Sequence, residues 1–287
     1  MLGQPYNINK DGLTMEKTAC RIRDSVAETL FIPLYMRALE SKRTDAIIKD
    51  DLACELVNSI DYDFSKYKSA KASELGCAIR IRHFDRKVEE FIENNPDGVV
   101  VLIGCGLDTR YQRIKNKSNT VFYELDLPEV IDLREKLLPQ TELDRYIKAS
   151  MFEKRWMDEL KEKHGNSPFI FIIEGVFMYF PEKDLLDFLS EIAERFVNSE
   201  IYFDICNKFV RGKASKHDAV KYTKAKFLSG FDSPAEIEKA VPNLTNIDEF
   251  YFADSEQSRW KLLGILFRLV PFLHNSFGIY GFKVKTQ

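Results

Sequence analysis

The sequence predicts a doubly wound, Rossmann-like α/β protein with a mostly parallel sheet of seven strands. Short β-branched and aliphatic runs alternate with amphipathic stretches of helical length between residues 99 and 206, which is typical of strand–helix–strand crossover units. Two glycines directly follow the first run, and an acidic residue ends the second. We therefore expect the glycines and the acid at the carboxyl edge of the sheet, where open α/β folds bind ligands.

Residues 15–95 are predicted to be largely helical, because apolar and charged residues recur at three-to-four spacing. Pro33 is expected to interrupt this part. An Asn-Asn-Pro-Asp-Gly turn at residues 94–98 ends it. We expect residues 1–95 to form a helical N-terminal cap and residues 96–287 to form the α/β core.

The core is expected to start with five strands and the helices between them. A continuous apolar run such as residues 169–173 suits a strand that is buried on both faces of a parallel sheet. The strands are predicted at residues 99–103, 120–125, 146–149, 169–174 and 200–206, and the helices at residues 107–117, 128–138, 153–164 and 181–197.

After residue 206 the alternation stops. Residues 207–243 are rich in lysine and are expected to form an insert that acts as a substrate lid. Two late strands are predicted at residues 245–253 and 277–284, with one helix at residues 256–269 between them. These strands would complete the sheet, with one antiparallel strand expected at an edge.

Composition excludes several classes of protein. Of the 287 residues, 45% are hydrophobic and 30% charged, and the net charge is −3, which argues against a surface that coats nucleic acid. The longest apolar run, at residues 169–173, is far shorter than the roughly 20 residues of a membrane-spanning helix. The first ten residues lack the apolar segment of a secretory signal. We expect a cytoplasmic protein that binds neither nucleic acid nor membranes; its oligomeric state stays open.

Cysteine and histidine usage predicts no metal site. The five cysteines are odd in number and have no C-x-x-C spacing, which fits a reduced compartment. The four histidines are scattered, so no zinc or iron ligand cluster is visible.

The segment from Val99 to Asp108 reads as a strand, a tight glycine turn and a helix start. Gly104 and Gly106 allow the backbone to turn sharply and to approach a ligand closely. Asp126 lies 22 positions after Gly104, at the end of the next predicted strand, which is the usual place for an acid that binds ribose hydroxyls. A turn that binds no ligand is the alternative interpretation.

The third position of the loop helps to choose among nucleotides. A dinucleotide-binding loop needs a third glycine close to the pyrophosphate, and Thr109 stands there instead. No G-K-[ST] sequence supports a nucleoside triphosphate. The loop therefore favours S-adenosyl-L-methionine, which has no phosphate, over a nicotinamide cofactor.

Three segments together resemble the leucine carboxyl methyltransferase family. They are the loop V-L-I-G-C-G-L-D-T-R at residues 101–110, F-Y-E-L-D-L-P at residues 122–128, and E-G-V-F-M-Y at residues 174–179. The resemblance covers roughly residues 15–206. The amino-acid sequence of the loop is most similar to the bacterial branch of the family, whose members methylate polyketide carboxylates. It implies a class I methyltransferase-like fold, S-adenosyl-L-methionine as methyl donor, and an oxygen acceptor, usually of a carboxylate.

The resemblance also implies roles for individual residues. Arg80 would bind the carboxylate of the cofactor, a task that suits the two-pronged guanidinium; Arg82 lies close enough in sequence to be the alternative. Arg21 matches a second basic residue near the same carboxylate. Gly104 and Gly106 match the cofactor loop.

The remaining matches follow the next strands. Asp126 would bind the ribose, and Ser150 and Met151 would flank the adenine. Glu174 would lie near the amino group of the cofactor, and Tyr179 would position the acceptor.

Simpler interpretations exist for several of these residues. Arg80 and Arg82 also suit an ordinary helix surface, and Tyr179 also suits a core. Glu174 ends a very apolar strand, where an unpaired carboxylate would be costly, so a ligand or a charged partner is expected. Asp108 is expected to pair with Arg110 or to cap the helix rather than touch the substrate.

The resulting hypothesis is an O-methyltransferase that acts on a carboxylate of a small, polyketide-like acid. A carboxylate has a reference pKa near 4 and is ionised at neutral pH, so it needs no general base. The alternatives are methyl transfer to a phenol or other hydroxyl, and a non-catalytic protein that only binds S-adenosyl-L-methionine.

Overall fold

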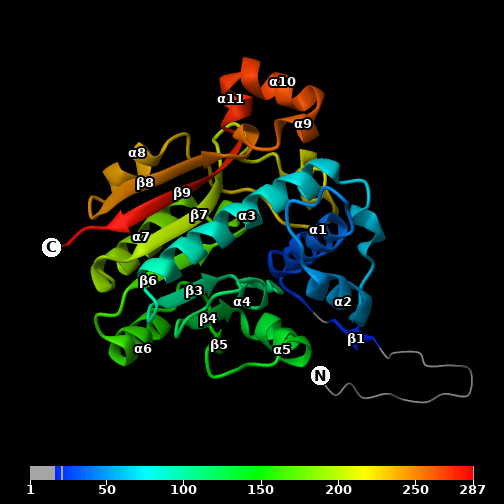
Figure 1. Ribbon diagram of the computed structural model, residues 1–287. Helices are drawn as coiled ribbons and strands as arrows, with labels where there is room; N and C mark the ends of the chain where they lie inside the picture. Colours follow the sequence, from blue (N-terminus) through cyan, green and yellow to red (C-terminus); the bar gives the residue numbers. More distant parts are fainter. Residues whose placement is uncertain (1–16, 21, 287) are drawn as a thin grey trace, which may run out of the picture.

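The computed structural model describes residues 17–20 and 22–286 and contains the predicted seven-stranded sheet (Figure 1). The strand order is β5-β4-β3-β6-β7-β9-β8, and the first five strands in this order are parallel. This confirms the doubly wound α/β class. The bounds are β3 Val99–Ile103, β4 Val121–Asp126, β5 Asp144–Lys148, β6 Phe169–Ile173, β7 Glu200–Cys206, β8 Leu244–Tyr251 and β9 Phe277–Val284.

The position expected for the reversed strand was wrong. Strand β9 runs antiparallel to both of its neighbours, β7 and β8, and so lies second from the edge. Its residues are buried almost throughout, whereas buried and accessible residues alternate along β8. The half-exposed strand therefore takes the edge, and the apolar strand is covered on both sides.

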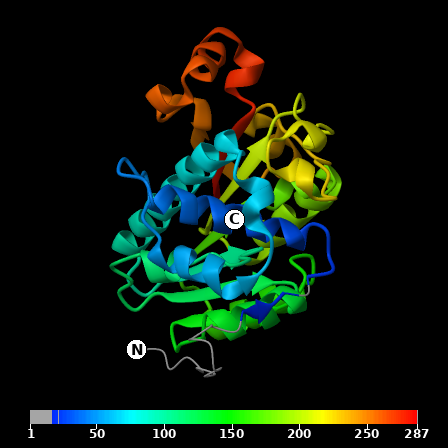
Figure 2. The same ribbon diagram turned by 90° about the vertical axis from the view of Figure 1, so that its right-hand side faces the viewer.

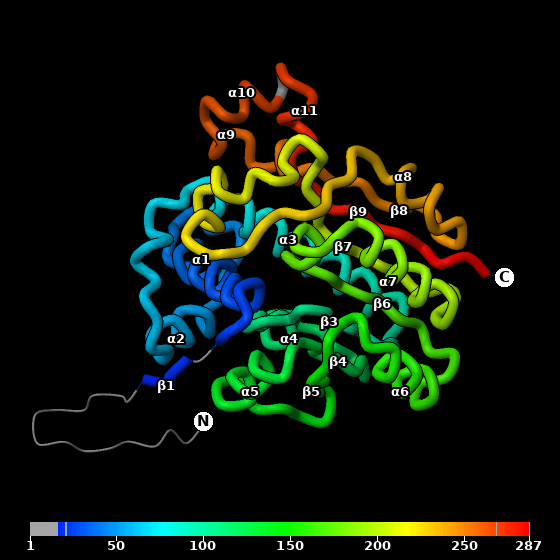
Figure 3. Tube along the Cα trace, turned by 180° about the vertical axis from the view of Figure 1, so that it is seen from behind, coloured from blue at the N-terminus to red at the C-terminus, as the bar shows by residue number. Residues whose placement is uncertain are grey.

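Helices cover both faces of the sheet (Figures 1 and 3). Helix α3 (Lys71–Asn94) packs Phe84, Val88 and Phe91 on the face that includes Val100 and Leu102. The opposite face, which includes Val101, is covered by α6 (Arg155–His164), α7 (Glu182–Arg195) and α8 (Pro234–Ala240). Because neighbouring residues of a strand point to opposite faces, one apolar run serves both layers.

Three further helices lie at one end of the sheet. Helices α1 (Phe31–Ser41) and α2 (Asp51–Ser59) share a core with α5 (Pro128–Leu137) and with residues Ala214 to Phe227 (Figure 2). A two-residue parallel pair, β1 (Thr18–Ala19) with β2 (Ile60–Asp61), was not predicted. These elements cover the sheet edge that carries the glycine loop.

Two predicted helices differ in the structure. Instead of a helix over residues 107–117, α4 is a single turn, Arg110–Arg113, after which Ile114 is extended and buried in the core. The helix at residues 256–269 is divided into α9 (Gln257–Trp260) and α10 (Leu262–Leu269), and α11 (Pro271–His274) follows. Trp260 is buried against α3, and the chain turns at Lys261, whose φ is 55°.

None of the helices in the described part of the chain is long and apolar enough to cross a membrane.

Candidate active site

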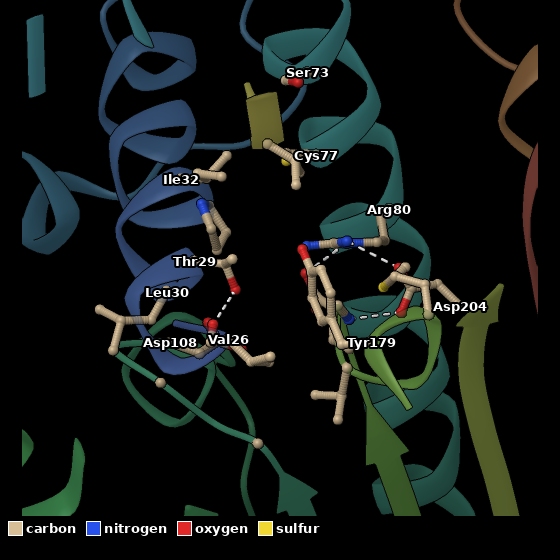
Figure 4. Close-up of a pocket in the computed structure, with 18 of the residues that line it drawn as sticks. Val26, Thr29, Leu30, Ile32, Ser73, Cys77, Arg80, Asp108, Tyr179 and Asp204 are labelled. Atoms are coloured by element: carbon tan, nitrogen blue, oxygen red, sulfur yellow. Dashed lines mark hydrogen bonds and ion pairs between the residues drawn. The ribbon is translucent and has the colours of Figure 1, made fainter. Parts of the chain in front are cut away.

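A cavity of about 640 Å³ lies at the carboxyl edge of β3, β4, β6 and β7, a size that suits a small-molecule ligand. Figure 4 shows it between the segment of Thr29 and Ile32 on one side and α3 on the other. Helix α3 contributes Ser73, Cys77 and Arg80 at helical spacing. The sheet edge supplies one end of the cavity, and the helical elements supply the other.

The glycine loop forms the cavity wall after β3. Gly104 and Gly106 have φ values of 67° and 51°, which side chains rarely tolerate. A Cβ on Gly104 would also overlap Cγ2 of Val176. The amides of Gly104 and Cys105 donate to the Leu125 carbonyl at 2.8 and 3.1 Å. The loop is therefore attached to β4 in a conformation that needs glycine.

Asp126 lines the cavity at the end of β4. One carboxylate oxygen accepts the Gly106 N–H at 2.8 Å, and the other accepts the Leu127 N–H at 2.7 Å. Each oxygen keeps a further acceptor site, since a carboxylate offers about four in all. Burial raises the pKa of Asp126 to about 6, although both amide bonds oppose the shift.

Arg134 of α5 supports the loop from behind, which the sequence did not suggest. Its side chain is fully buried, and Nη1 donates to the carbonyls of Gly106 at 3.2 Å and Asp108 at 2.6 Å. Nη2 lies 2.8 Å from a carboxylate oxygen of the equally buried Glu124. The guanidinium thus connects β4 to the glycine loop.

We expect Arg134→Met to lower the free energy of unfolding by about 3–5 kcal/mol, because it leaves the Glu124 carboxylate buried without its charge partner. Urea denaturation measures the change. Arg145→Met is the control, since Arg145 is exposed on β5 and bonds only to the Glu142 carbonyl among described partners. Equal and small effects of the two substitutions would contradict the role given to Arg134.

Arg80 faces two carboxylates at the sheet edge. Its Nε donates to Glu174 at 3.0 Å and its Nη1 to Asp204 at 2.8 Å (Figure 4). Asp204 also accepts the Gly175 N–H at 2.6 Å, and burial raises its pKa. Arg82 lies on another side of α3, is 44% exposed and pairs with Glu256. Of the two arginines considered, Arg80 is therefore the one at the cavity.

Glu174 has two charged partners, as its apolar strand required. Besides Arg80 it accepts Nη2 of Arg110 at 2.6 Å. Arg110 also pairs with Asp108 at 3.1 Å, which bears out the expected pairing. Burial alone would raise the pKa of Asp108, but Arg110 and Arg113 hold it well below its usual range.

This ion-pair network extends into the helical cap. Arg37 donates to Asp50 at 2.8 Å and to the Leu107 carbonyl at 2.6 Å. The hydroxyl of Thr109, the residue at the third loop position, donates to the same Asp50. The loop is therefore connected to α1 and α2 by buried charged groups.

The remaining predicted residues fall in different places. Ser150 and Met151 line the cavity after β5. Tyr179, in the short turn Phe177–Tyr179, is buried and stands beside the Arg80 guanidinium (Figure 4). Arg21 lies outside the described residues.

Sequence reasoning missed Asp204, although a signal was available. It lies near the carboxyl end of β7, at the same sheet edge as Asp126 and Glu174, where polar residues are expected to face a ligand.

One end of the cavity, which includes the first residue of β9, is lined mainly by aromatic side chains. Tyr179 and Phe227 are 5.8 Å apart, and Phe252 and Phe277 are 6.4 Å apart, measured between ring centroids. Helix α10 turns Leu263 toward this end. Further lining residues are Gly76, Lys216, His217, Asp218, Val220, Trp260 and Phe267.

Comparison with known proteins identifies the family. A profile of the leucine carboxyl methyltransferase family matches residues 31–193. The chain belongs to this family. It is 30% identical over 230 residues, 80% of this chain and 84% of the other, to the tetracenomycin polyketide synthesis O-methyltransferase TcmP of Streptomyces glaucescens.

Two further comparisons concern the cofactor and the fold. The S-adenosyl-L-methionine-dependent methyltransferase dpfgK of Gibberella zeae is 24% identical, with 81% of this chain and 84% of the other aligned. A solved structure from Thermobifida fusca YX, provisionally described as a methyltransferase, superposes with a TM-score of 0.57 at 11% identity. The superposition covers 88% of this chain and 94% of the other chain, and it confirms the fold. The protein is thus an S-adenosyl-L-methionine-dependent methyltransferase.

No group of three or more metal-ligating side chains is present among residues 17–20 and 22–286.

Proposed function

We propose that this methyltransferase transfers the methyl group of S-adenosyl-L-methionine to a carboxylate oxygen of a small, polyketide-like aromatic acid. The similarity to an O-methyltransferase of polyketide synthesis supports the class of acceptor. The aromatic end of the cavity supports a flat, apolar acceptor, because aromatic side chains bind rings through offset or edge contacts.

The charges of the cavity fit the cofactor. Adenosylmethionine carries an ammonium, a sulfonium and one carboxylate, so its net charge is positive. Among the described lining residues, acidic groups outnumber basic ones, which favours a cationic ligand. The acids are Asp24, Asp108, Asp126, Glu174, Asp204 and Asp218, and the bases are Arg37, Arg80, Arg110 and Lys216.

In this proposal, Asp126 accepts hydrogen bonds from the ribose hydroxyls with its two remaining acceptor sites. Ser150 and Met151 flank the adenine. Arg80 uses part of its guanidinium for the bonds to Glu174 and Asp204. Its remaining N–H groups would bind the cofactor carboxylate. Glu174 would lie near the amino group. Arg21 would act as a second basic residue, as the family resemblance implies.

The observation that favours a carboxylate over a hydroxyl acceptor is that the acidic side chains of the cavity already accept hydrogen bonds within the protein. Each of the six already accepts hydrogen bonds from amides or arginines: Asp24 from Val26 and Ala27, for example, and Asp218 from the amides of Ala72 and Ser73. A phenol needs a base to take its proton. A carboxylate is already ionised.

The bound cofactor supplies an electrophilic methyl group, so the chain has to position the acceptor and exclude water. Tyr179 stands next to Arg80, between the cofactor loop and the aromatic end, and would hold the acceptor in line. The apolar lining would keep the reacting groups dry. Residues 1–95 would act as the cap, and residues 207–243 as the lid that completes the acceptor chamber.

The test uses purified protein, radiolabelled S-adenosyl-L-methionine, and the paired compounds 2-naphthoate and 2-naphthol, with benzoate and anthracene-2-carboxylate as size variants. We expect an alkali-labile methyl ester from at least one acid and no product from the naphthol. An alkali-stable ether from the naphthol would overturn the carboxylate assignment. Cofactor binding without transfer to any compound would favour the non-catalytic alternative.

In this proposal, the missing side chain of Gly76 leaves space for the acceptor. A Cβ at this helical position would lie 3.9 Å from Phe252 and 4.0 Å from Trp260, both at the aromatic end of the cavity. Gly76→Leu should fill that space and lower kcat/KM for the bicyclic acid by at least about 10-fold, since overpacking costs about 1–3 kcal/mol. The Kd for the cofactor should stay unchanged.

Gly76→Ala is the matched control for this substitution. The methyl group fits the space, and alanine favours the helix by up to about 1 kcal/mol, so activity should persist with a higher melting temperature. A leucine variant that is as active as the alanine variant would place the acceptor elsewhere.

A further inference from the structure

Among the described residues, the aromatic end of the cavity contains one imidazole, His217, next to Asp218 and Val220. It follows the short turn Ala214–Lys216, and its side chain is 24% exposed. The ring meets Phe227 and Phe277 edge-on, with centroids 5.7 and 5.8 Å apart. Aromatic neighbours therefore restrict the orientation of the ring.

Backbone contacts define how the ring is protonated. The amides of Ala219 and Val220 both point at Nδ1, at 3.4 and 3.2 Å. Both groups are donors, so Nδ1 has to be the acceptor and cannot carry a hydrogen itself. In a neutral imidazole the other nitrogen then carries the proton. Nε2 is thus an N–H donor.

Burial disfavours a protonated ring, and the two charged neighbours, Asp218 and Arg80, act in opposite directions. Asp218 is 3.7 Å from Nδ1, but its oxygens accept the amides of Ala72 and Ser73 and the Ser73 hydroxyl. Burial lowers the pKa of His217; Asp218 opposes the shift and Arg80 adds to it. The two amides that donate to Nδ1 point to a neutral imidazole with its hydrogen on Nε2, and the lowered pKa is in the same direction.

We propose that His217 binds the acceptor carboxylate by donating its Nε2–H to the oxygen that is not methylated. The inference rests on the proposed function. A neutral donor in an aromatic chamber orients one carboxylate oxygen without holding the acceptor as a fixed ion pair would. Methylation removes the negative charge of the acceptor and weakens this hydrogen bond, which helps the ester to leave.

The same geometry excludes His217 as a general base. A base must accept a proton through a free ring nitrogen. Nδ1 already accepts two amides, and Nε2 already carries a hydrogen. His217 therefore adds selectivity for acids over phenols, in agreement with the engaged carboxylates of the cavity.

The first test observes the tautomer directly. Nitrogen NMR of the full protein labelled with ¹⁵N-histidine, with adenosylhomocysteine bound, distinguishes protonated from bare ring nitrogens. His217→Asn identifies the signals of His217 by their absence. We expect a bare Nδ1 and a protonated Nε2 near neutral pH. An Nδ1–H tautomer or a doubly protonated ring would overturn the proposal.

The second test adds benzoate, 2-naphthoate and anthracene-2-carboxylate to the same sample. We expect at least one acid to shift the Nε2–H signal of His217, and matched 2-naphthol to leave it in place. If all three acids leave this signal unchanged up to their solubility limits, the proposal is wrong.

Two variants separate the two nitrogens. The oxygen of Asn can take the place of Nδ1 and accept the amides of Ala219 and Val220, but the pocket donor is lost. The amide of Gln can replace the Nε2–H donor. We expect His217→Asn to weaken binding of the acid by about 10-fold or more, as for a hydrogen bond to a charged group, and His217→Gln to remain within about 3-fold of the parent.

Equal weakening in both folded variants would mean that the ring only packs, and would overturn the proposal. A variant with an altered melting curve leaves the decision to the NMR tests. The acid-binding measurements need no turnover, so they also distinguish this proposal from the proposed function. If the enzyme methylates a hydroxyl but the Nε2–H signal still shifts with acids, the proposed function is wrong and the role of His217 stands. If methyl esters form but no acid shifts the Nε2–H signal, only the role of His217 is wrong.

Discussion

Asp126→Ala is expected to weaken binding of S-adenosyl-L-methionine by at least about 100-fold, because two hydrogen bonds to a charged acceptor contribute about 1.5–3 kcal/mol each. The carboxylate also holds the loop, since it accepts the Gly106 and Leu127 amides at 2.8 and 2.7 Å. Its loss therefore removes both the ribose acceptor and the constraint on the glycine turn. Titration calorimetry with S-adenosyl-L-methionine and with adenosylhomocysteine measures the effect.

Asp132→Ala is the matched control. Asp132 lies on α5, only six positions further along, but its side chain is 58% exposed and pairs with Lys148 on the surface. Exposed pairs contribute about 0–1 kcal/mol, so this variant should bind the cofactor as the parent does. Equal affinities of the two variants would remove Asp126 from the cofactor site.

The raised pKa of Asp126 adds a pH dependence to cofactor binding. With a pKa of about 6 in the empty site, the carboxyl takes up a proton at mildly acidic pH and loses acceptor capacity. Affinity should be constant above about pH 7 and fall by up to tenfold per pH unit below about pH 6. Calorimetry across this range checks it. An equally steep fall in Asp126→Ala would assign the dependence to another group.

The same shift has the opposite sign for stability of the empty protein. The folded pKa of about 6 lies above the ordinary value of 3.8, so the folded state binds more protons between these values. Its stability therefore decreases as pH rises through this window. The cofactor should offset this loss, because it binds the ionised form.

The sequence predicted those parts of the fold that depend on local pattern. The runs Val99–Ile103 and Phe169–Ile173 are apolar on both faces, which only a covered strand explains, and both are strands. The glycine turn and the acid that ends β4 were readable because parallel strands bring their carboxyl ends together. Position along the chain was therefore enough to place Gly104 and Asp126 at one edge.

The ion-pair network could not be predicted in the same way. Arg134 sits in a run of helical residues with charged neighbours and looks like a surface residue, yet it is fully buried. Arg37 finds its partners 13 and 70 positions away. Such pairs depend on the packing of separate elements, which no local spacing records. The reversal of β9 likewise depends on which strand is covered on both sides, a property of the assembled sheet.

Arg80→Met should show the largest combined effect on stability and binding. Removing the guanidinium leaves the carboxylates of Glu174 and Asp204 without a charge that lies 3.0 and 2.8 Å away. Breaking a buried pair costs about 3–5 kcal/mol, and we expect a loss of this size in the free energy of unfolding. Binding of the cofactor should fall by at least about 10-fold, since a charge-assisted bond to its carboxylate is lost.

Arg82→Met is the control on the same helix. Residues two positions apart on a helix point about 200° apart, and Arg82 faces Glu256 on the surface at 2.7 Å. This variant should lose less than about 1 kcal/mol and bind the cofactor normally. Effects larger than those of Arg80→Met would mean that Arg82, the alternative suggested by the sequence, is the functional arginine.

A double substitution separates the structural role of Arg80 from its role toward the ligand. Arg80→Met alone leaves the buried Asp204 carboxylate without its charge partner. The added Asp204→Leu removes that carboxylate, and replacing both partners of a buried pair by apolar residues is often neutral or stabilising. Glu174 keeps Arg110 as a partner at 2.6 Å. We therefore expect unfolding stability to recover in part, since the Gly175 amide still loses its acceptor, while cofactor affinity stays low. If affinity recovers together with stability, Arg80 acts only by holding the sheet edge together, and the cofactor carboxylate is bound by another group.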